Sequence, residues 1–233
     1  MSKRFEGRVA VVTGGGSGIG AAIANRLLEE GASVMISGRT EKRLSEAAYK
    51  MPTERSGTFV ANVSSRPDCD ALVAATLERF GRIDTVVNAA GMNLVGTIEE
   101  TSDQDWDECI ASDLSGVFYM SRAAVPHLKE TKGSIVNIGS VSSLGGGWSH
   151  AAYNAAKGGV ANLTRSAACD LGKFGVRANT VAPGLTVTGM VDAIMDDDAL
   201  LEKAWDRIPL RRAGQPEEIA RRSLFLPVMK LPG

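Results

Sequence analysis

The chain has 233 residues, of which 44% are hydrophobic and 23% charged, values that suit one globular domain with a buried core. Lys and Arg (26) nearly balance Asp and Glu (27), so no net field attracts nucleic acid or an anionic membrane. The three cysteines and two histidines match no zinc-site spacing. No apolar run is long enough to span a bilayer, and the first residues lead directly into a strand pattern. We therefore expect a cytoplasmic protein with reduced thiols, no metal, no nucleic-acid partner and no membrane anchor.

Short β-rich apolar runs alternate with helical stretches from Arg8 onward. Most runs are apolar throughout, as in parallel strands that helices cover on both faces. The predicted strands are residues 9–13, 33–37, 58–62, 83–88, 134–138 and 177–182. The predicted helices are residues 19–30, 41–50, 67–80, 102–130 and 151–173, with Gly31, Gly81 and Gly175 just past helix ends. The pattern predicts an α/β fold: one Rossmann-type domain over residues 1–233, doubly wound, with helices on both faces of a parallel sheet.

A glycine-rich turn over residues 13–20 (Thr-Gly-Gly-Gly-Ser-Gly-Ile-Gly) joins the first strand to the first helix. Glycines here let backbone N–H groups approach a pyrophosphate, and the helix N-terminus favours its negative charge. The position between a strand and a helix distinguishes the turn from a flexible loop. We predict a dinucleotide cradle formed by Gly14, Ser17, Gly18, Ile19 and Gly20.

Tyr153 and Lys157 lie four residues apart, so their side chains share one face of a helix. A tyrosine hydroxyl can give a proton to a carbonyl oxygen or take one from an alcohol. An ammonium group beside the phenol favours its ionised form. Such a pair is also common on helix surfaces without function, but Ser140 and the cradle favour the catalytic interpretation.

Four motifs in this order resemble those of the short-chain dehydrogenase/reductase family. They are the turn of residues 13–20, Asn88-Ala89-Ala90-Gly91, Tyr153-x-x-x-Lys157 with Ser140 upstream, and Pro183-Gly184. The resemblance implies an NAD(P)-dependent oxidoreductase that interconverts a secondary alcohol or diol and its ketone by hydride transfer. It implies that Tyr153 is the acid/base, that Lys157 also binds the nicotinamide ribose and that Ser140 orients the substrate oxygen. The other cofactor contacts that it implies are Asn62, Val63, Asn88, Ala89, Gly91, Pro183, Gly184, Thr186 and Thr188.

The second predicted strand is followed by Gly38-Arg39. An acidic side chain at position 38 would bind the adenosine ribose diol and repel a 2′-phosphate, whereas the Arg39 guanidinium can pair with that phosphate. We therefore expect NADP(H), with NAD(H) as the alternative. Two features favour the alternative. Ser17 is not basic, and residues 140–148 resemble those of meso-2,3-butanediol dehydrogenases, which use NAD. Asn62 replaces an aspartate that reads adenine in the family, and its carbonyl can accept from the same amine.

Asp113 stands where relatives carry the asparagine of the catalytic tetrad. In the family the main-chain carbonyl of this residue holds a water molecule that links the lysine to solvent. That role does not depend on the side chain, so we expect the proton path to persist. The carboxylate would, however, add a negative charge near Lys157.

The resemblance places the substrate between residues 140–148, Asn93-Leu94 and a loop over residues 185–210. The expected substrate contacts are Ser140, Ser142, Trp148, Tyr153 and Leu185. A small alcohol or ketone is the expected partner. Two alternatives stay open: a 3-oxoacyl-thioester reductase, and a redox-silent, nucleotide-sensing binding protein, which would typically have lost one of the three catalytic side chains.

The resemblance also implies a homodimer or homotetramer, because the helices that correspond to residues 102–130 and 151–173 form a dimer interface in the family. It fails after Leu226, where relatives continue into a seventh strand. Here Pro227 and Pro232 interrupt the pattern, as a truncation or a shifted reading frame would. We expect that the seventh strand is missing and that the strand at 177–182 is a sheet edge.

Overall fold

The computed structural model describes residues 3–224 and 226. Six strands form one parallel sheet in the order β3-β2-β1-β4-β5-β6. The strands are β1 (Val9–Thr13), β2 (Ser33–Gly38), β3 (Ser56–Val60), β4 (Thr85–Asn88), β5 (Ser134–Ile138) and β6 (Arg177–Val181). The order changes direction between β1 and β4, which makes a crevice at the carboxyl ends of these two strands. The predicted doubly wound Rossmann-type fold is confirmed.

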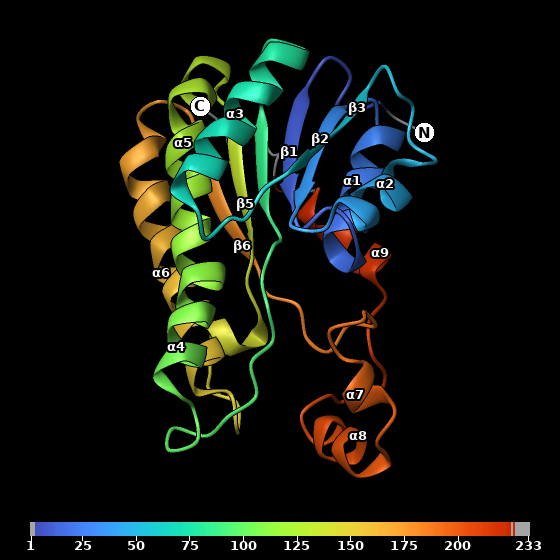
Figure 1. Cartoon of the computed structure of the whole chain (residues 1–233), viewed down its shortest axis with the longest axis vertical. Helices are drawn as coiled ribbons and strands as arrows, with labels where there is room; N and C mark the ends of the chain where they lie inside the picture. Colours follow the sequence, from blue (N-terminus) through green and yellow to red (C-terminus); the bar gives the residue numbers. More distant parts are fainter. Residues whose placement is uncertain (1–2, 225, 227–233) are drawn as a thin grey trace.

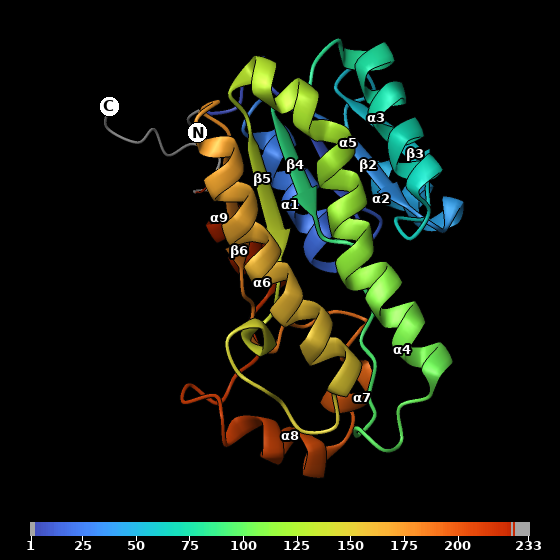
Figure 2. The same ribbon diagram turned by 90° about the vertical axis from the view of Figure 1, so that its left-hand side faces the viewer.

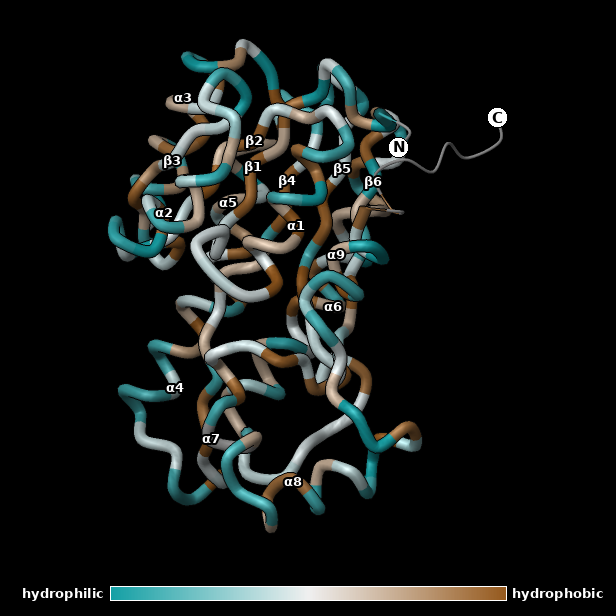
Figure 3. The backbone as a smooth tube through the Cα atoms, turned by 90° about the vertical axis from the view of Figure 1, so that its right-hand side faces the viewer, coloured by the Kyte–Doolittle hydropathy of each residue, from teal (hydrophilic) through white to brown (hydrophobic). Residues whose placement is uncertain are grey.

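Helices cover both faces of the sheet (Figure 1). The larger ones are α1 (Gly18–Glu29), α2 (Glu41–Ala48), α3 (Arg66–Phe80), α4 (Asp103–Ile110), α5 (Gly116–Thr131), α6 (Ala151–Gly172) and α9 (Pro216–Ser223). Neighbouring strand residues point to opposite faces. Val12 packs with α1, α2 and α9, whereas Val11 packs with α3, α5 and α6. Both cores follow the strands, and Figure 3 shows hydrophobic, brown stretches in the sheet.

Two short helices, α7 (Asp192–Met195) and α8 (Asp198–Trp205), lie apart from the sheet. Figures 1 and 2 both place them at the end toward which the strands run, below the sheet. They belong to the 185–210 segment that was expected to cover the substrate. We call residues 185–210 the lid.

The structure differs from the sequence prediction in several places: α7 and α8 were not predicted, and the bounds of several elements shift by about two residues. Strand β3 spans Ser56–Val60 instead of 58–62, because the chain leaves the sheet at Asn62, whose backbone N–H donates to Asp68 Oδ2 at 2.8 Å. The helix predicted over residues 102–130 is helical from Asp103 onward, but five residues in its middle, Ala111–Ser115, are π-helical and divide it into α4 and α5. Gly31, Gly81 and Gly175 have φ angles of 98°, 76° and 75°, which confirms that left-handed residues end these helices.

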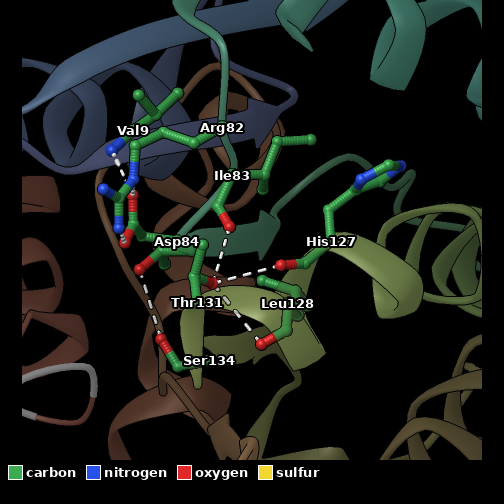
Figure 4. A network of polar contacts seen from close by, with 9 residues as sticks. Val9, Arg82, Ile83, Asp84, His127, Leu128, Thr131 and Ser134 are labelled. Carbon is green, nitrogen blue, oxygen red and sulfur yellow. Dashed lines mark hydrogen bonds and ion pairs between the residues drawn. The ribbon is translucent and has the colours of Figure 1, made fainter.

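The amino ends of the strands are joined by a separate polar network (Figure 4). Asp84, which is buried, accepts from Val9 N at 2.9 Å and from both Arg82 Nε and Nη2 at 2.9 and 2.7 Å. Thr131 Oγ1 donates to Ile83 O at 2.8 Å. These hydrogen bonds use polar backbone groups at the start of β1 and just before β4. The polar groups at this end of the sheet are thus paired with each other, and we look for the functional site at the carboxyl ends of the strands.

Within the described residues the sheet ends at β6. The expectation of a missing seventh strand rests on Pro227 and Pro232, which lie outside the described residues. Helix α9, the last described helix, packs against α1 through Ala220. In the described part of the chain, no helix has the length and apolarity required to cross a bilayer.

Candidate active site

The glycine-rich turn packs tightly against the neighbouring strand ends. Gly14 has φ +67°, and a Cβ there would lie 2.8 Å from the backbone of Ala89 and Ala90. A Cβ at Gly20 would lie 2.3 Å from Gly14 O. Neither position tolerates a side chain, because backbone atoms are already in contact. The turn is therefore fixed in the crevice between β1 and β4.

Helix α1 starts without a side-chain cap, since Ser17 at its N-cap is exposed and makes no capping bond. Its first N–H groups, near Gly18 and Ile19, are therefore available to an external acceptor. Open N–H groups beside glycine backbone at a helix N-terminus suit a pyrophosphate. The predicted cradle residues thus lie together and fit a dinucleotide phosphate.

The ends of β1 and β4 are joined by Thr13, which sequence reasoning did not assign to the site. Thr13 Oγ1 accepts from Ala89 N at 3.2 Å and from Ala90 N at 3.3 Å. Asn88, predicted as a cofactor contact, directs its side chain toward β5 and α5. Its Nδ2 donates to Asn137 Oδ1 at 2.8 Å and to Ser121 Oγ at 3.0 Å. Asn88 therefore orders the strand ends, and its backbone remains to face a ligand.

Lys157 and Asp113 form a buried ion pair. Lys157 Nζ lies 3.1 Å from Asp113 Oδ2, and their side chains are 7% and 0% exposed. Lys157 Nζ also donates to Ile138 O at 3.2 Å, at the end of β5. Asp113 Oδ1 accepts from Met92 N at 2.8 Å and from Ser112 Oγ. The carboxylate thus holds the ammonium directly, a side-chain contact that the sequence analysis did not foresee.

The π-helical segment places Asp113 where it reaches Lys157. Insertions of this type in helices are frequent at functional sites. Gly91 is the neighbour that makes room, because a Cβ there would lie 2.7 Å from Asp113 Oδ2. Gly91, predicted as a cofactor residue, therefore also leaves the space that the Asp113 carboxylate occupies. Cys109 lies in the same region, and burial, the largest cause, together with the Asp113 charge raises the pKa of its thiol to about 11, so it stays protonated.

Tyr153 lies on the same helix as Lys157, with Lys157 Nζ 5.6 Å from the centre of the Tyr153 ring. The ring packs against the small cluster of Cys109, Ala152 and Ala156. The imidazole of His150 meets it edge-on with ring centres 6.0 Å apart. The ring of Tyr153 is thus held on several sides, and it is half-buried.

Ser140 lies two residues after the end of β5, and its side chain is buried. Its Oγ accepts from Ser142 N at 3.1 Å, and its backbone N–H donates to Ser143 Oγ at 3.1 Å. Val141 N donates to Pro183 O at 2.9 Å. Because its Oγ accepts from Ser142, the hydroxyl hydrogen of Ser140 is available to a substrate oxygen.

The loop after β6 reaches back to the cradle. A Cβ at Gly18 would lie 3.1 Å from Thr188 Cγ2, so two predicted cofactor residues are neighbours. Thr186 is buried, and its Oγ1 donates to Gly184 O at 3.0 Å. Leu185, predicted to contact substrate, accepts from Gly214 N at 2.9 Å through its carbonyl. Gly214 is a further anchor of this loop that sequence reasoning missed.

The residues predicted to select the cofactor follow two neighbouring strands, Arg39 after β2 and Asn62 and Val63 after β3. Arg39 follows β2 and is exposed. Asn62 is exposed, and its Oδ1 accepts from Ser64 N at 3.1 Å. Val63 lies against Gly116, with its Cγ2 2.8 Å from where a Cβ would stand. Arg43, which the sequence analysis did not single out, packs its Cβ 3.3 Å from the Cβ position of Gly16 and adds a second cation here.

Of the predicted substrate residues, Ser142 is half-buried beside Ser140, whereas Trp148 is 78% exposed. An open cleft of about 460 Å³ is lined by Gly146, Gly147, Trp148 and Arg207. Arg207 comes from the lid and had no recognisable signal in the sequence. Among the residues described here, no group of three His, Cys, Asp or Glu side chains could hold a metal ion.

The sequence is similar to those of known proteins. The sequence profile of the family described as "Enoyl-(Acyl carrier protein) reductase" matches residues 14–228. The chain is 41% identical to a meso-2,3-butanediol dehydrogenase of Serratia marcescens over 223 residues, which cover 96% of this chain and 88% of that protein. It is 37% identical to a 3-oxoacyl-[acyl-carrier-protein] reductase of Thermotoga maritima over 227 residues, or 96% and 91% of the two chains.

A solved structure agrees with these sequences. The crystal structure of a short-chain dehydrogenase/reductase of unknown function from Caenorhabditis elegans, with cofactor, matches with a TM-score of 0.86. It is 32% identical, and the match covers 97% of this chain and 89% of that one. Fold, motif order and relatives lead to the same result: the chain is an oxidoreductase of the short-chain dehydrogenase/reductase family, whose members use NAD or NADP.

Proposed function

We propose that this protein interconverts a secondary alcohol or diol and the corresponding ketone with NADP(H), NAD(H) being the alternative cofactor. The observation that carries the proposal is the buried Lys157–Asp113 pair, 3.1 Å apart, on the helix that holds Tyr153. Burying an ammonium group lowers the stability of the fold unless the charge is paired, and here Asp113 pairs with it. The serine, tyrosine and lysine that the chemistry needs are all present, which argues against a redox-silent protein.

When bound, the nicotinamide supplies or accepts the hydride. Ser140 donates its free hydroxyl hydrogen to the substrate oxygen and holds that oxygen beside Tyr153. Tyr153 gives its proton to the oxygen during reduction and takes one during oxidation. Lys157 has three N–H donors, of which one binds Ile138 O, and its Nζ pairs with Asp113 Oδ2 at 3.1 Å. A further N–H is left for a ribose hydroxyl, and the ammonium favours the phenolate of Tyr153.

The decisive experiment is an activity panel of NADPH and NADH against diacetyl, acetoin, cyclic ketones and acetoacetyl thioesters. Turnover of the small ketones, lost in Tyr153→Phe, would support the proposal. The second candidate is a 3-oxoacyl-thioester reductase, favoured by the 37% identity to the Thermotoga maritima reductase. A higher kcat/KM for the thioesters than for the small ketones would favour this second candidate.

We place the activity in the cytoplasm, in keeping with the three free cysteines.

Arg39→Ala is expected to raise the KM for NADPH about tenfold or more while leaving that for NADH nearly unchanged. Its exposed guanidinium follows β2, and a charge-assisted phosphate contact contributes about 1.5–3 kcal/mol. Steady-state kinetics with both cofactors measures the effect. Lys42→Ala is the control, because Lys42 is an exposed cation one turn away. A wild-type protein that already prefers NADH would reject the role of Arg39.

We also propose a homodimer or homotetramer built through α4, α5 and α6. Trp106 on α4 and Phe118 on α5 are 43% and 41% exposed, large apolar groups of the kind that a partner covers. Light scattering is expected to give a multiple of 24.5 kDa. Phe118→Glu should lower this mass, whereas Tyr49→Glu, at an 86% exposed site on another surface, should not. A wild-type mass of one chain at micromolar concentration would contradict the proposal.

A further inference from the structure

The lid and the segment after Ser140 meet at Arg207, which makes two contacts. Arg207 Nη1 donates to Gly146 O at 3.1 Å. The Arg207 guanidinium carbon lies 5.4 Å from the centre of the Trp148 ring, within the range of a cation–π contact. The two side chains line the open cleft of about 460 Å³ together with Gly146 and Gly147. A cation and an aromatic face thus stand at the mouth of the candidate substrate region.

Arg207 differs from the other arginines near the end of the lid. Arg211 pairs with Glu202 at 2.5 Å, and Arg212 pairs with both oxygens of Glu218 at 2.9 Å. Within the described part of the chain, Arg207 has only the neutral carbonyl of Gly146 and the Trp148 ring as partners. Its positive charge is therefore not neutralised by a carboxylate, and it faces a cleft.

The cleft is connected to Tyr153 through two residues. Trp148 O lies 2.7 Å from His150 Nδ1, and the His150 ring meets the Tyr153 ring edge-on at 6.0 Å. His150 is itself held, because Gly96 N donates to Ser149 O at 2.8 Å and Ala151 N donates to Gly96 O at 3.1 Å. A substrate that extends from Tyr153 past His150 would arrive at Trp148.

The segment that carries Trp148 has room to adapt. A Cβ at Gly145 or Gly146 would meet no atom within 4 Å, and glycine backbone changes conformation at little cost. The carbonyl of Gly146 can therefore leave Arg207 when a stronger acceptor arrives. A carboxylate bonds to a guanidinium about twice as strongly as a neutral carbonyl does.

We propose that Arg207 and Trp148 form an outer subsite that binds an anionic group, such as a carboxylate, at the end of the substrate remote from the reacting carbon. The proposal rests on the proposed function, because it names the class of alcohol or ketone that the same site takes. Arg207 binds the anion, and Trp148 packs against the chain that leads to it. A neutral ketone would contact Ser140 and Tyr153 but would not need Arg207.

The test compares keto acids with their methyl esters at several chain lengths. Wild-type protein is expected to show a higher kcat/KM for the acid than for the ester at the length that spans the two sites. Arg207→Ala should lower kcat/KM for that acid about tenfold or more, mostly through KM, and leave the ester within about threefold. Arg211→Ala is the control, since Arg211 directly follows the lid but is paired with Glu202.

Binding without turnover separates this proposal from the proposed function. Calorimetric titration of hexanoate into the cofactor-loaded protein should give at least tenfold weaker binding in Arg207→Ala than in wild type. If no ketone is reduced but hexanoate binds in this Arg207-dependent way, the subsite stands and the proposed reaction fails. If ketones are reduced and the acid-to-ester ratio is the same in wild type and Arg207→Ala, the subsite is wrong. An equal loss for acid and ester would show that Arg207 only closes the lid, which also overturns the proposal.

Discussion

Tyr153→Phe is expected to lower kcat about 10²- to 10⁴-fold, the range that a positioned acid/base contributes. The substitution removes one oxygen and keeps the ring, which packs against the Cys109, Ala152 and Ala156 cluster and the edge of His150. Fold and cofactor cradle should therefore persist. The cofactor dissociation constant, measured by fluorescence titration, should stay within about twofold of wild type. Turnover of the best substrate in the activity panel gives the loss in kcat.

The matched control is Tyr49→Phe, which removes a hydroxyl from a side chain that is 86% exposed and should leave kcat unchanged. Lys157→Ala separates the two roles on this helix. Because one donor of Lys157 is left for the ribose, this variant should lose both turnover and cofactor affinity. More than a few per cent of wild-type activity in Tyr153→Phe would show that another group carries the proton.

The fold could be predicted from the sequence because its signals are local. Runs such as residues 9–13 have the composition of buried parallel strands, and Gly81 or Gly175 marks a helix end through its own φ angle. The cradle was predictable for the same reason, since Gly14 and Gly20 must lack side chains where backbones touch. The π-helical stretch Ala111–Ser115 inside the 102–130 helix was not predictable, because its residues have no distinctive propensity.

The candidate site was only partly predictable, because several of its contacts join distant segments. The sequence placed Asp113 near Lys157 by resemblance, and assigned its role to the main chain. The direct contact of its carboxylate depends on the π-helical segment and on the space beside Gly91. Arg207 and Gly214 were not predicted as site residues for a similar reason, because each forms a hydrogen bond with a residue distant in the sequence, Gly146 and Leu185 respectively. Such pairings follow from topology, and no short motif records them.

Removing either partner of the Lys157–Asp113 pair is expected to destabilise the protein strongly. Both side chains are buried, and a buried charge left without its partner costs about 3–5 kcal/mol. Asp113→Leu and Lys157→Met should each lower the free energy of unfolding by about that amount, or the melting temperature by about 6–20 °C. Asp113→Asn should lose nearly as much. Its amide would turn a donor toward either the ammonium or the Met92 N–H, both of which are donors.

The double variant Asp113→Leu/Lys157→Met distinguishes an ion pair from two independent core residues. If the cost comes from the unpaired charge, removing both charges should restore at least half of the lost stability. Independent side chains would instead give additive losses, and that result in urea unfolding would contradict the pair. Asp107→Leu, at an exposed position on α4, controls for the leucine. The double variant should remain inactive although it is folded, because the ammonium that favours the Tyr153 phenolate and reaches the ribose is gone. The double variant would thereby separate stability from catalysis. Asp113 would be needed for stability only because Lys157 is charged, whereas Lys157 would be needed for the reaction itself.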